Sequence, residues 1–546
     1  MAIQVYQSFS AYYHRTALII LLVGFLVRLV ISICLNPGFD EAYYYLYTLH
    51  PDWSYFDHPP LVTLTTGIGV WLTGQVSQFT IRIGTLLLYT GSLLFLYLAT
   101  LRLYTLQIAI NTLAIASAIP IFQIAFGVLS TPDTPLLFFW SMSLWLAVQE
   151  FFDYRGYRPS FRLTLLCFAV GLACLGKYHG FVLGLGLIGF CLFSRNYRPA
   201  LTSRWFSIGI AIFLVTISPI LAWNINHGWA SFHLQVGNGK YLIDSLLETL
   251  RERLGGILSI DLLYLFPAFG VPLLWAIIRT SIQQVRNIRW GQFAGNRGFK
   301  DEWELEKRGL ILWLSLPLIL GFTFISGDRQ MLPSAQMSGY WTATILLAER
   351  VSIERRNAAV RIPYRWFFGS LAVVILLSSI ALSHVTLGTL QASNKPSIFG
   401  LLPISTDSST QIFDIQQLRQ GLVNNSQLNL ALKNADFVFT NRYYLGGQIG
   451  MAIEPVFHKP ITCFDADLRS FAFWSKPQDW VGKNAIYLST KTAEVDLDAT
   501  NIYPSYFKEI TKLGEIPIRR GGVVIQTFSI YQAQNMLKPF PRPYGN

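Results

Sequence analysis

Acidic residues lie among aromatic residues in the segment 36–60, NPGFDEAYYYLYTLHPDWSYFDHPP. The segment contains the adjacent pair Asp40 and Glu41 and ends in Asp57, His58 and two prolines, but it has no Lys or Arg. Carboxylates accept hydrogen bonds from sugar hydroxyls and can take a proton from a reacting group. Aromatic faces suit the C–H faces of a sugar ring. The mixture favours a sugar site with an acid or base in it, whereas a simple helix cap is the alternative for the acidic pair.

Tyrosine and asparagine side chains are the candidates for contacting that sugar. The segment itself supplies Tyr43, Tyr44 and Tyr55. Tyr178 in GKYHGF and Asn224 in WNINHGWASFHLQ lie in two later stretches that interrupt apolar runs. A stretch rich in Asn, Trp and His is also typical of anchoring at a membrane surface.

The composition is that of an integral membrane protein. Of 546 residues, 52% are hydrophobic and 13% are charged, which is too apolar for an ordinary soluble protein. The formal net charge of +12 comes from basic residues in short loops between apolar runs, which is a membrane pattern and does not point to nucleic acid. No P-loop or Rossmann glycine pattern occurs, so no nucleotide is expected, and the five cysteines form no Cys/His cluster.

The apolar runs predict a polytopic α-helical membrane protein. A helix spans the hydrocarbon with roughly 17–25 apolar residues, and on that criterion we expect about 11–13 transmembrane helices. The spans are placed near 17–35, 80–101, 105–122, 133–150, 162–176, 180–194, 205–222, 258–279, 308–325, 334–349 and 366–385. The run 61–79 is interrupted by Gly and Thr, which favours a helix along the membrane interface.

The distribution of Lys and Arg predicts the orientation. Basic residues gather in the loops around 155–162, 195–204, 286–308 and 355–365, which we therefore place in the cytoplasm. The complementary loops, including 36–79 and 223–257, have few basic residues and are expected outside. The protein is thus predicted to be a multi-pass protein of the cytoplasmic (inner) membrane.

The composition changes after the last span. We predict a transmembrane domain over 1–390, with outer loops 36–79 and 223–257, and a small extracytoplasmic soluble α/β domain over 391–546. In the latter, ADFVFT, PITCF, NAIYLST and GGVVIQTFSIYQ read as short strands between turn residues.

Further charged residues lie on the predicted outer side. Asp133 in STPDTPLLFFW begins a span and can converge with Asp40. Lys177 lies between two apolar runs, where a cation at helix-centre depth costs about 2.5–3.5 kcal/mol. Its side chain therefore either extends to the membrane interface or binds an anion. Together with Arg329 in SGDRQMLP and His58, it would form a phosphate site.

The order of these motifs resembles a known enzyme group. FDEAYYYLY, YFDHPPL, TPDTPLLFFW, GKYHGF, WNINHGWASFHLQ and SGDRQMLP follow one another over roughly residues 15–350. This order is similar to that of polyprenyl-phosphate-dependent membrane glycosyltransferases of the C-type fold, in particular the group of the lipid A aminoarabinose transferase and the protein O-mannosyltransferases. The outer tail domain also suits the aminoarabinose-transferase branch.

The resemblance implies roles for the acidic and basic residues. Asp40 would be the catalytic acidic residue with Glu41 beside it, and Asp133 would line the same cavity. Lys177, His58 and Arg329 would bind the donor phosphate. The related enzymes often have Glu-Lys at the place of Asp57 and His58. By position, the resemblance implies that Asp57 and His233 hold a divalent metal, zinc or a similar ion.

The implied activity is transfer of a sugar from a polyprenyl-phosphate donor to an envelope lipid resembling lipid A or to a protein hydroxyl, on the extracytoplasmic face and with inversion. Asp40 would take the acceptor's proton and cations would stabilise the departing phosphate. A secondary transporter or glycolipid flippase is the alternative, and a non-enzymatic glycan-binding scaffold is a third reading. The polar residues concentrate on one side, which favours surface chemistry over alternating access.

Overall fold

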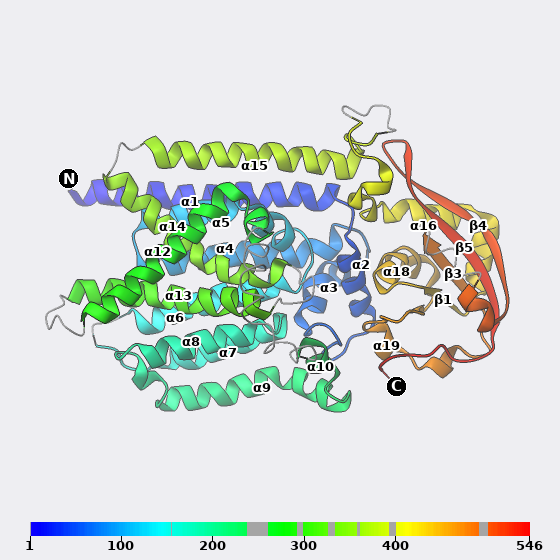
Figure 1. The fold of residues 1–546 in the computed structure, drawn as a ribbon, viewed down its shortest axis with the longest axis horizontal. Coiled ribbons are helices and arrows are strands. Elements are labelled where there is room, and N and C mark those ends of the chain that lie inside the picture. Colours follow the sequence, from blue (N-terminus) through cyan, green and yellow to red (C-terminus); the bar gives the residue numbers. More distant parts are fainter. Residues whose placement is uncertain are drawn as a thin grey trace.

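The chain forms a bundle of long helices with a small α/β unit at one end (Figure 1). The structure is a computed structural model that describes residues 2–153, 156–236, 260–291, 299–325, 333–357, 361–392, 400–490 and 501–545. The bundle consists of α1 (Ala2–Cys34), α4 (Ile83–Leu103), α5 (Leu106–Ala118), α6 (Asp133–Phe151), α7 (Phe161–Gly176), α8 (Gly180–Phe193), α9 (Arg204–Asn226), α12 (Pro267–Gly291), α13 (Phe299–Ile325), α14 (Met337–Asn357) and α15 (Arg361–Leu387).

These helices confirm the prediction of a polytopic helical membrane protein. Each predicted span overlaps one of them, although the start of the span near 258–279 lies outside the described residues. Within the described ranges, four helices are long and apolar enough to cross a membrane: His14–Cys34, Thr80–Leu103, Arg204–Asn226 and Tyr364–Leu387. Others, such as α5, α7 and α8, are apolar but shorter.

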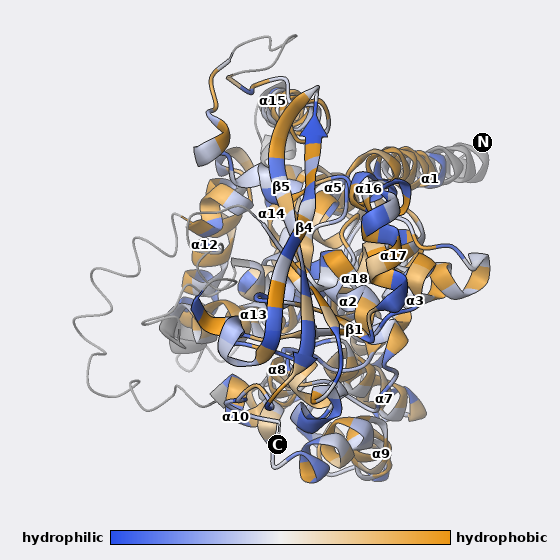
Figure 2. Cartoon of the chain, turned by 90° about the vertical axis from the view of Figure 1, so that its right-hand side faces the viewer, coloured by the Kyte–Doolittle hydropathy of each residue, from blue (hydrophilic) through white to orange (hydrophobic). Residues whose placement is uncertain are grey.

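The outer surface of the bundle is apolar where lipid would contact it. Leu18, Leu22, Leu26 and Val30 follow one another at helical spacing on α1, and all are exposed. Exposed leucine and valine in such a row are typical of a lipid-facing helix. Figure 2 shows hydrophobic residues along α1 and α3, whereas β4 carries long hydrophilic stretches.

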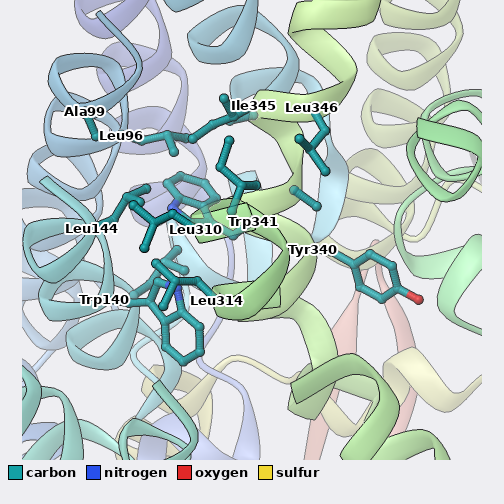
Figure 3. Close-up of a cluster of buried hydrophobic side chains, with 14 of the residues drawn as sticks. Leu96, Ala99, Trp140, Leu144, Leu310, Leu314, Tyr340, Trp341, Ile345 and Leu346 are labelled. Atoms are coloured by element: carbon teal, nitrogen blue, oxygen red, sulfur yellow. The ribbon is translucent and has the colours of Figure 1, made fainter. Parts of the chain in front are cut away.

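The core of the bundle lies between α4, α6, α13 and α14 (Figure 3). Trp140 of α6 donates a hydrogen bond to the hydroxyl of Thr342 at 2.8 Å, and Trp341 of α14 donates one to Ser141 at 2.9 Å. Each buried indole N–H thus finds a partner on the facing helix. The pair fixes α6 against α14 and thereby positions Asp133, the first residue of α6.

Two shorter helices lie at the end of the bundle that carries the α/β unit (Figure 1). These are α2 (Phe39–Leu49) and α3 (Leu61–Thr73). The 13 residues of α3 give a length of about 20 Å, which is too short to cross the hydrocarbon. The structure therefore agrees with a non-spanning helix in the region 61–79.

The α/β unit contains one mixed sheet with the strand order β2-β1-β3-β5-β4. Strands β2, β1 and β3 are parallel, and β5 and β4 form an antiparallel pair beside β3. The unit contains α16 (Ile415–Asn424), α17 (Ser426–Asn434), β1 (Phe437–Thr440), α18 (Tyr443–Phe457), β2 (Ile461–Cys463), α19 (Phe471–Trp474), β3 (Ala485–Thr490), β4 (Phe507–Arg520) and β5 (Val523–Met536). Helix α18 lies between the sheet and α2 (Figure 1).

Candidate functional site

Asp40 is a predicted site acid that has no ion-pair partner in the part of the chain that the structure describes. It lies in the first turn of α2 and is half-buried. Within the described ranges its carboxylate forms neither an ion pair nor a hydrogen bond. Burial raises its pKa from 3.8 to about 6, and the negative charge of Asp57 adds to the rise. Arg469 and Lys177 oppose this shift, so both cations lie within electrostatic range of Asp40.

Glu41, the neighbour of Asp40, is fully paired. Its two oxygens accept hydrogen bonds from Nε and Nη2 of Arg82, each at 2.7 Å, and both side chains are buried. The same carboxylate accepts the N–H groups of Ser130 and Gly38, each at 2.9 Å. Arg82 also donates to three backbone carbonyls at the end of α1. Glu41 therefore ties α2 to α4 and to the start of α6, and no lone pair is left for a substrate.

Asp133 and Lys177 form a second buried ion pair. The Lys177 ammonium lies 2.8 Å from one carboxylate oxygen of Asp133 and 3.0 Å from the other. Lys177 is the residue that ends α7, and its side chain is mostly buried. The structure thus brings the two predicted residues together, and the charge of Lys177 lowers the pKa of Asp40.

Asp57 is held by tyrosines of α2 and by a serine of the α/β unit. One of its oxygens accepts hydrogen bonds from Tyr47, from Tyr43 at 3.4 Å and from Ser470 at 3.1 Å. The backbone N–H of Ser470 donates in turn to the Tyr43 hydroxyl at 2.9 Å. This network fixes the loop that contains Asp57 to the α/β unit, a contact that no pattern in the sequence predicts.

His58 is neutral near pH 7. Burial lowers its pKa from 6.5 to about 4, although the charge of Asp57 opposes the shift. Its Nδ1 atom is buried and has no hydrogen-bond partner within the described ranges. Burial thus favours the neutral ring of His58, which offers an N–H donor, and its role at the donor phosphate stays a prediction.

The predicted sugar-contacting residues divide into two groups. Tyr44 lies one turn after Asp40, and burial followed by the charge of Asp40 raises its pKa well above the ordinary value. Tyr178 is half-buried, and its buried hydroxyl forms no hydrogen bond within the described ranges. By contrast, Tyr55 stacks on Tyr47 at 3.9 Å and its hydroxyl donates to a backbone carbonyl.

Tyr43 and Asn224 also have structural partners. The hydroxyl of Tyr43 is shared between Asp57 and the N–H of Ser470. The side chain of Asn224 accepts the N–H of Ser231 and donates to Ile220, which shapes the turn after α9. These two residues therefore support the site's walls through contacts within the protein.

The expected metal pair does not fit a metal. The Asp57 oxygen described above already accepts three hydrogen bonds, whereas His233 is exposed on α10 (Ala230–Val236). His233 lines a separate hollow of about 1000 Å³ between α10 and the residues around α19. The described part of the chain holds no group of three or more His, Cys, Asp or Glu suited to a metal ion. Arg329 lies outside the described residues.

Two residues near Asp40 were not anticipated from the sequence. Arg82 is the partner of Glu41, and Arg469 comes from the α/β unit. Arg82 is a lone arginine at the end of an apolar run. Because a buried cation needs an anion, this position could have predicted an acidic partner for it. Arg469 is 429 positions after Asp40, so no local pattern could join the two.

Comparisons with known proteins agree with the resemblance in motif order. A family model described as dolichyl-phosphate-mannose-protein mannosyltransferase matches residues 57–223. The lipid A galacturonosyltransferase RgtD of Rhizobium johnstonii is 24% identical over 320 residues, which cover 56% of this chain and 59% of RgtD. The chain thus matches less than two thirds of that relative's length.

Solved structures share the fold. The crystal structure of ArnT from Cupriavidus metallidurans bound to undecaprenyl phosphate has a TM-score of 0.55 and 14% identity, covering 94% of this chain and 97% of ArnT. The apo form of ArnT gives a TM-score of 0.55 at 15% identity, covering 96% of this chain and 98% of ArnT. The chain therefore has the C-type glycosyltransferase fold with a C-terminal α/β unit, as predicted.

Proposed function

We propose that this protein is a membrane glycosyltransferase that moves a sugar from a polyprenyl-phosphate donor to a hydroxyl acceptor. The relatives named above are transferases, and one structural neighbour binds undecaprenyl phosphate. The observation that carries the proposal is the contrast among three neighbouring acids. Glu41 and Asp133 are neutralised by Arg82 and Lys177, whereas Asp40 is left unpaired with a raised pKa.

Asp40 is the general base in this proposal. A base works best when its pKa lies near the operating pH, and a pKa of about 6 leaves Asp40 mostly ionised at pH 7 yet able to hold a proton. It takes the proton of the acceptor hydroxyl as the oxygen attacks the anomeric carbon and the bond to the donor phosphate breaks. Attack from the side opposite the phosphate inverts the anomeric configuration, as in an inverting glycosidase with the water replaced by the acceptor.

Positive charge close to Asp40 stabilises the departing phosphate. Lys177 is paired with Asp133, but its positive charge still lowers the pKa of Asp40 and so also acts on an anion beside that carboxyl, and Arg329 stays a predicted contributor. His58 donates a hydrogen bond in its neutral form.

The chemistry takes place on the extracytoplasmic side of the cytoplasmic membrane. This side follows from the basic loops at the other end of the bundle. The transmembrane domain comprises 1–390, and the α/β domain of 391–546 lies outside above the site. Both an envelope lipid resembling lipid A and a protein hydroxyl are accessible acceptors from there.

Mass spectrometry of the cell envelope tests the proposal. Envelope lipids and proteins from cells with the chain, without it, and with an Asp40→Asn copy are compared. We expect one lipid or protein to carry an additional sugar residue only when the wild-type chain is present. Identical lipid and protein profiles in the three strains would reject the function, and would leave a transporter as the better reading.

A further inference from the structure

The α/β unit places one arginine at the edge of the site. Arg469 lies just before α19, and the next residue, Ser470, donates its hydroxyl to Asp57 and its N–H to Tyr43. The hydrogen bond to Tyr43 therefore docks this segment on α2, one turn after Asp40.

The backbone and side chain of Arg469 are held in an unusual arrangement. Its φ is +50°, in the left-handed region that costs free energy for a residue with a Cβ. The N–H of Arg469 donates to the Tyr544 hydroxyl at 2.9 Å, which holds this conformation. The guanidinium lies over the ring of Tyr443, 5.1 Å from its centroid. Strained residues persist where the surrounding structure fixes them, and they cluster at functional sites.

The terminal nitrogens of Arg469 have no partner in the described part of the chain. Nε donates to Asp467 at 3.1 Å, but Nη1 and Nη2 make neither a hydrogen bond nor an ion pair there. The side chain is 30% exposed and thus accessible. A planar guanidinium with two free ends binds phosphate and carboxylate in a forked geometry.

The other cations near Asp40 are already engaged. Lys177 contacts both oxygens of Asp133, and Arg82 contacts both oxygens of Glu41. Arg469, in contrast, lowers the pKa of Asp40 and of His58 without pairing with either. Its charge therefore acts on Asp40, His58 and, most strongly, Asp57, to which the next residue, Ser470, is hydrogen-bonded.

We infer that Arg469 of the α/β unit forms an oxyanion subsite that binds a phosphate or carboxylate group of the substrate beside Asp40. This inference rests on the proposed function for the identity of the substrate, but the subsite itself is defined by the geometry. The α/β unit is then part of the binding site.

Binding of farnesyl phosphate, of farnesol and of galacturonate to the purified full chain tests the subsite. Arg469→Asn removes the guanidinium and suits the left-handed backbone, because Asn adopts positive φ more readily than most residues. Arg469→Lys keeps a charge but loses the fork. Arg519→Gln, near the β4–β5 turn, is the matched control, since it removes one surface cation of the same unit.

We expect Arg469→Asn to weaken binding of one anion by about tenfold to hundredfold and to leave farnesol binding unchanged. Arg469→Lys should fall between wild type and Arg469→Asn, and Arg519→Gln should match wild type. Weaker binding of farnesyl phosphate alone identifies a phosphate subsite, and weaker binding of galacturonate alone identifies a carboxylate subsite.

Equal affinities of wild type and Arg469→Asn for both anions would overturn the inference, including the case in which neither anion binds. Thermal unfolding of each variant verifies that the fold is kept. The binding assay needs no turnover. A chain that binds an anion through Arg469 but transfers no sugar would thus contradict the proposed function and leave the subsite in place.

Discussion

Three acidic side chains at one end of the bundle differ in their ability to act as a base, because their hydrogen-bond and ion-pair partners differ. Glu41 sits against Arg82, Asp133 sits against Lys177, and Asp40 has neither cation. A carboxylate in a buried ion pair is a poor base, because its charge is already stabilised and protonation would leave the cation unpaired. Asp40 and Glu41 are neighbours in the sequence, and what distinguishes them is that Glu41 is paired with Arg82 whereas Asp40 is not paired with a cation in the described residues.

The pH dependence of transfer should report Asp40. The base must be ionised, and burial raises its pKa to about 6, so activity is full above this value and is lost as the pH falls through it. We expect kcat/KM to show an acid limb with an apparent pKa of about 6, measured under conditions in which the protein stays folded. An acid limb near the ordinary aspartate value of 3.8 would contradict the burial of Asp40.

The pair of Glu41 and Arg82 should matter for folding. Removing one partner of a buried ion pair costs about 3–5 kcal/mol, because the other charge stays buried. We therefore expect Arg82→Ala to lower the thermal unfolding temperature in detergent strongly. Asp40→Asn is the matched variant: it removes a half-buried charge without a partner, so its unfolding temperature should equal or exceed that of wild type. Equal unfolding temperatures for Arg82→Ala and wild type would refute the structural role of the pair.

The residue types of the site could be predicted from the sequence, but their pairing could not. Asp40, Asp133 and Lys177 stand out as charges beside apolar runs, and Asp133 and Lys177 do meet in the structure. The partners of Asp57 are Ser470, Tyr47 and Tyr43, and of these only Tyr43 was predicted, as a sugar contact. Such pairings depend on long-range packing, which no spacing within the sequence encodes.

Among the elements, the contact between α2 and α18 fixes the position of the α/β unit relative to the helix bundle. A Cβ added to Gly447 would lie 2.5 Å from the backbone nitrogen of Tyr43, so only glycine allows the two helices to approach this closely. Gly450, one turn later, faces Leu46 at a similar distance. The close approach brings α19 and Arg469 over the site.

Gly447→Val should therefore separate α18 from α2. Overpacking at a backbone contact costs about 1–3 kcal/mol, and here the helix itself must shift. We expect faster hydrogen exchange in α2 and α18 and a loss of transfer activity. Gly369→Ala on α15 is the control, because its added Cβ meets open space. Unchanged exchange in α2 and α18 of Gly447→Val would contradict this contact.

The elements themselves were largely predictable because their patterns are local. Long apolar runs marked the bundle helices, three of the predicted strand segments contain β1, β2 and β3, and the fourth covers all of β5 except its last residues. The exception is β4, an edge strand that contains Lys508, Glu509 and Pro517. Charges and proline are typical of edge strands but weaken the strand signal in the sequence.

At the scale of the whole molecule, the last bundle helix is fastened to the α/β unit. His384 near the end of α15 lies 3.1 Å from Asp407, which also accepts a hydrogen bond from Arg520 of β4 at 2.5 Å. Both ends of the unit are thus tied to the bundle, through α15 on one side and α2 on the other. The two predicted units, which meet at residue 390 in the sequence, are therefore also joined by buried contacts between their side chains.

The predicted orientation can be measured with thiol labelling in a Cys34→Ser background, which removes the cysteine that is exposed. Lys476→Cys lies beside α19, and Arg195→Cys lies in the loop between α8 and α9, and both positions are exposed. We expect a membrane-impermeant maleimide to label position 476 in spheroplasts, and to label position 195 only after permeabilisation. The reverse pattern would place the site in the cytoplasm.

The proposed role of Asp40 is to activate an acceptor for sugar transfer from a polyprenyl phosphate. Its most direct test is the release of polyprenyl phosphate by purified wild type and by Asp40→Asn, with the same lipid-linked sugar and an acceptor identified from the envelope. We predict that Asp40→Asn lowers kcat by about 10²–10⁴ while the protein stays folded. Turnover by folded Asp40→Asn at the wild-type rate would contradict the account.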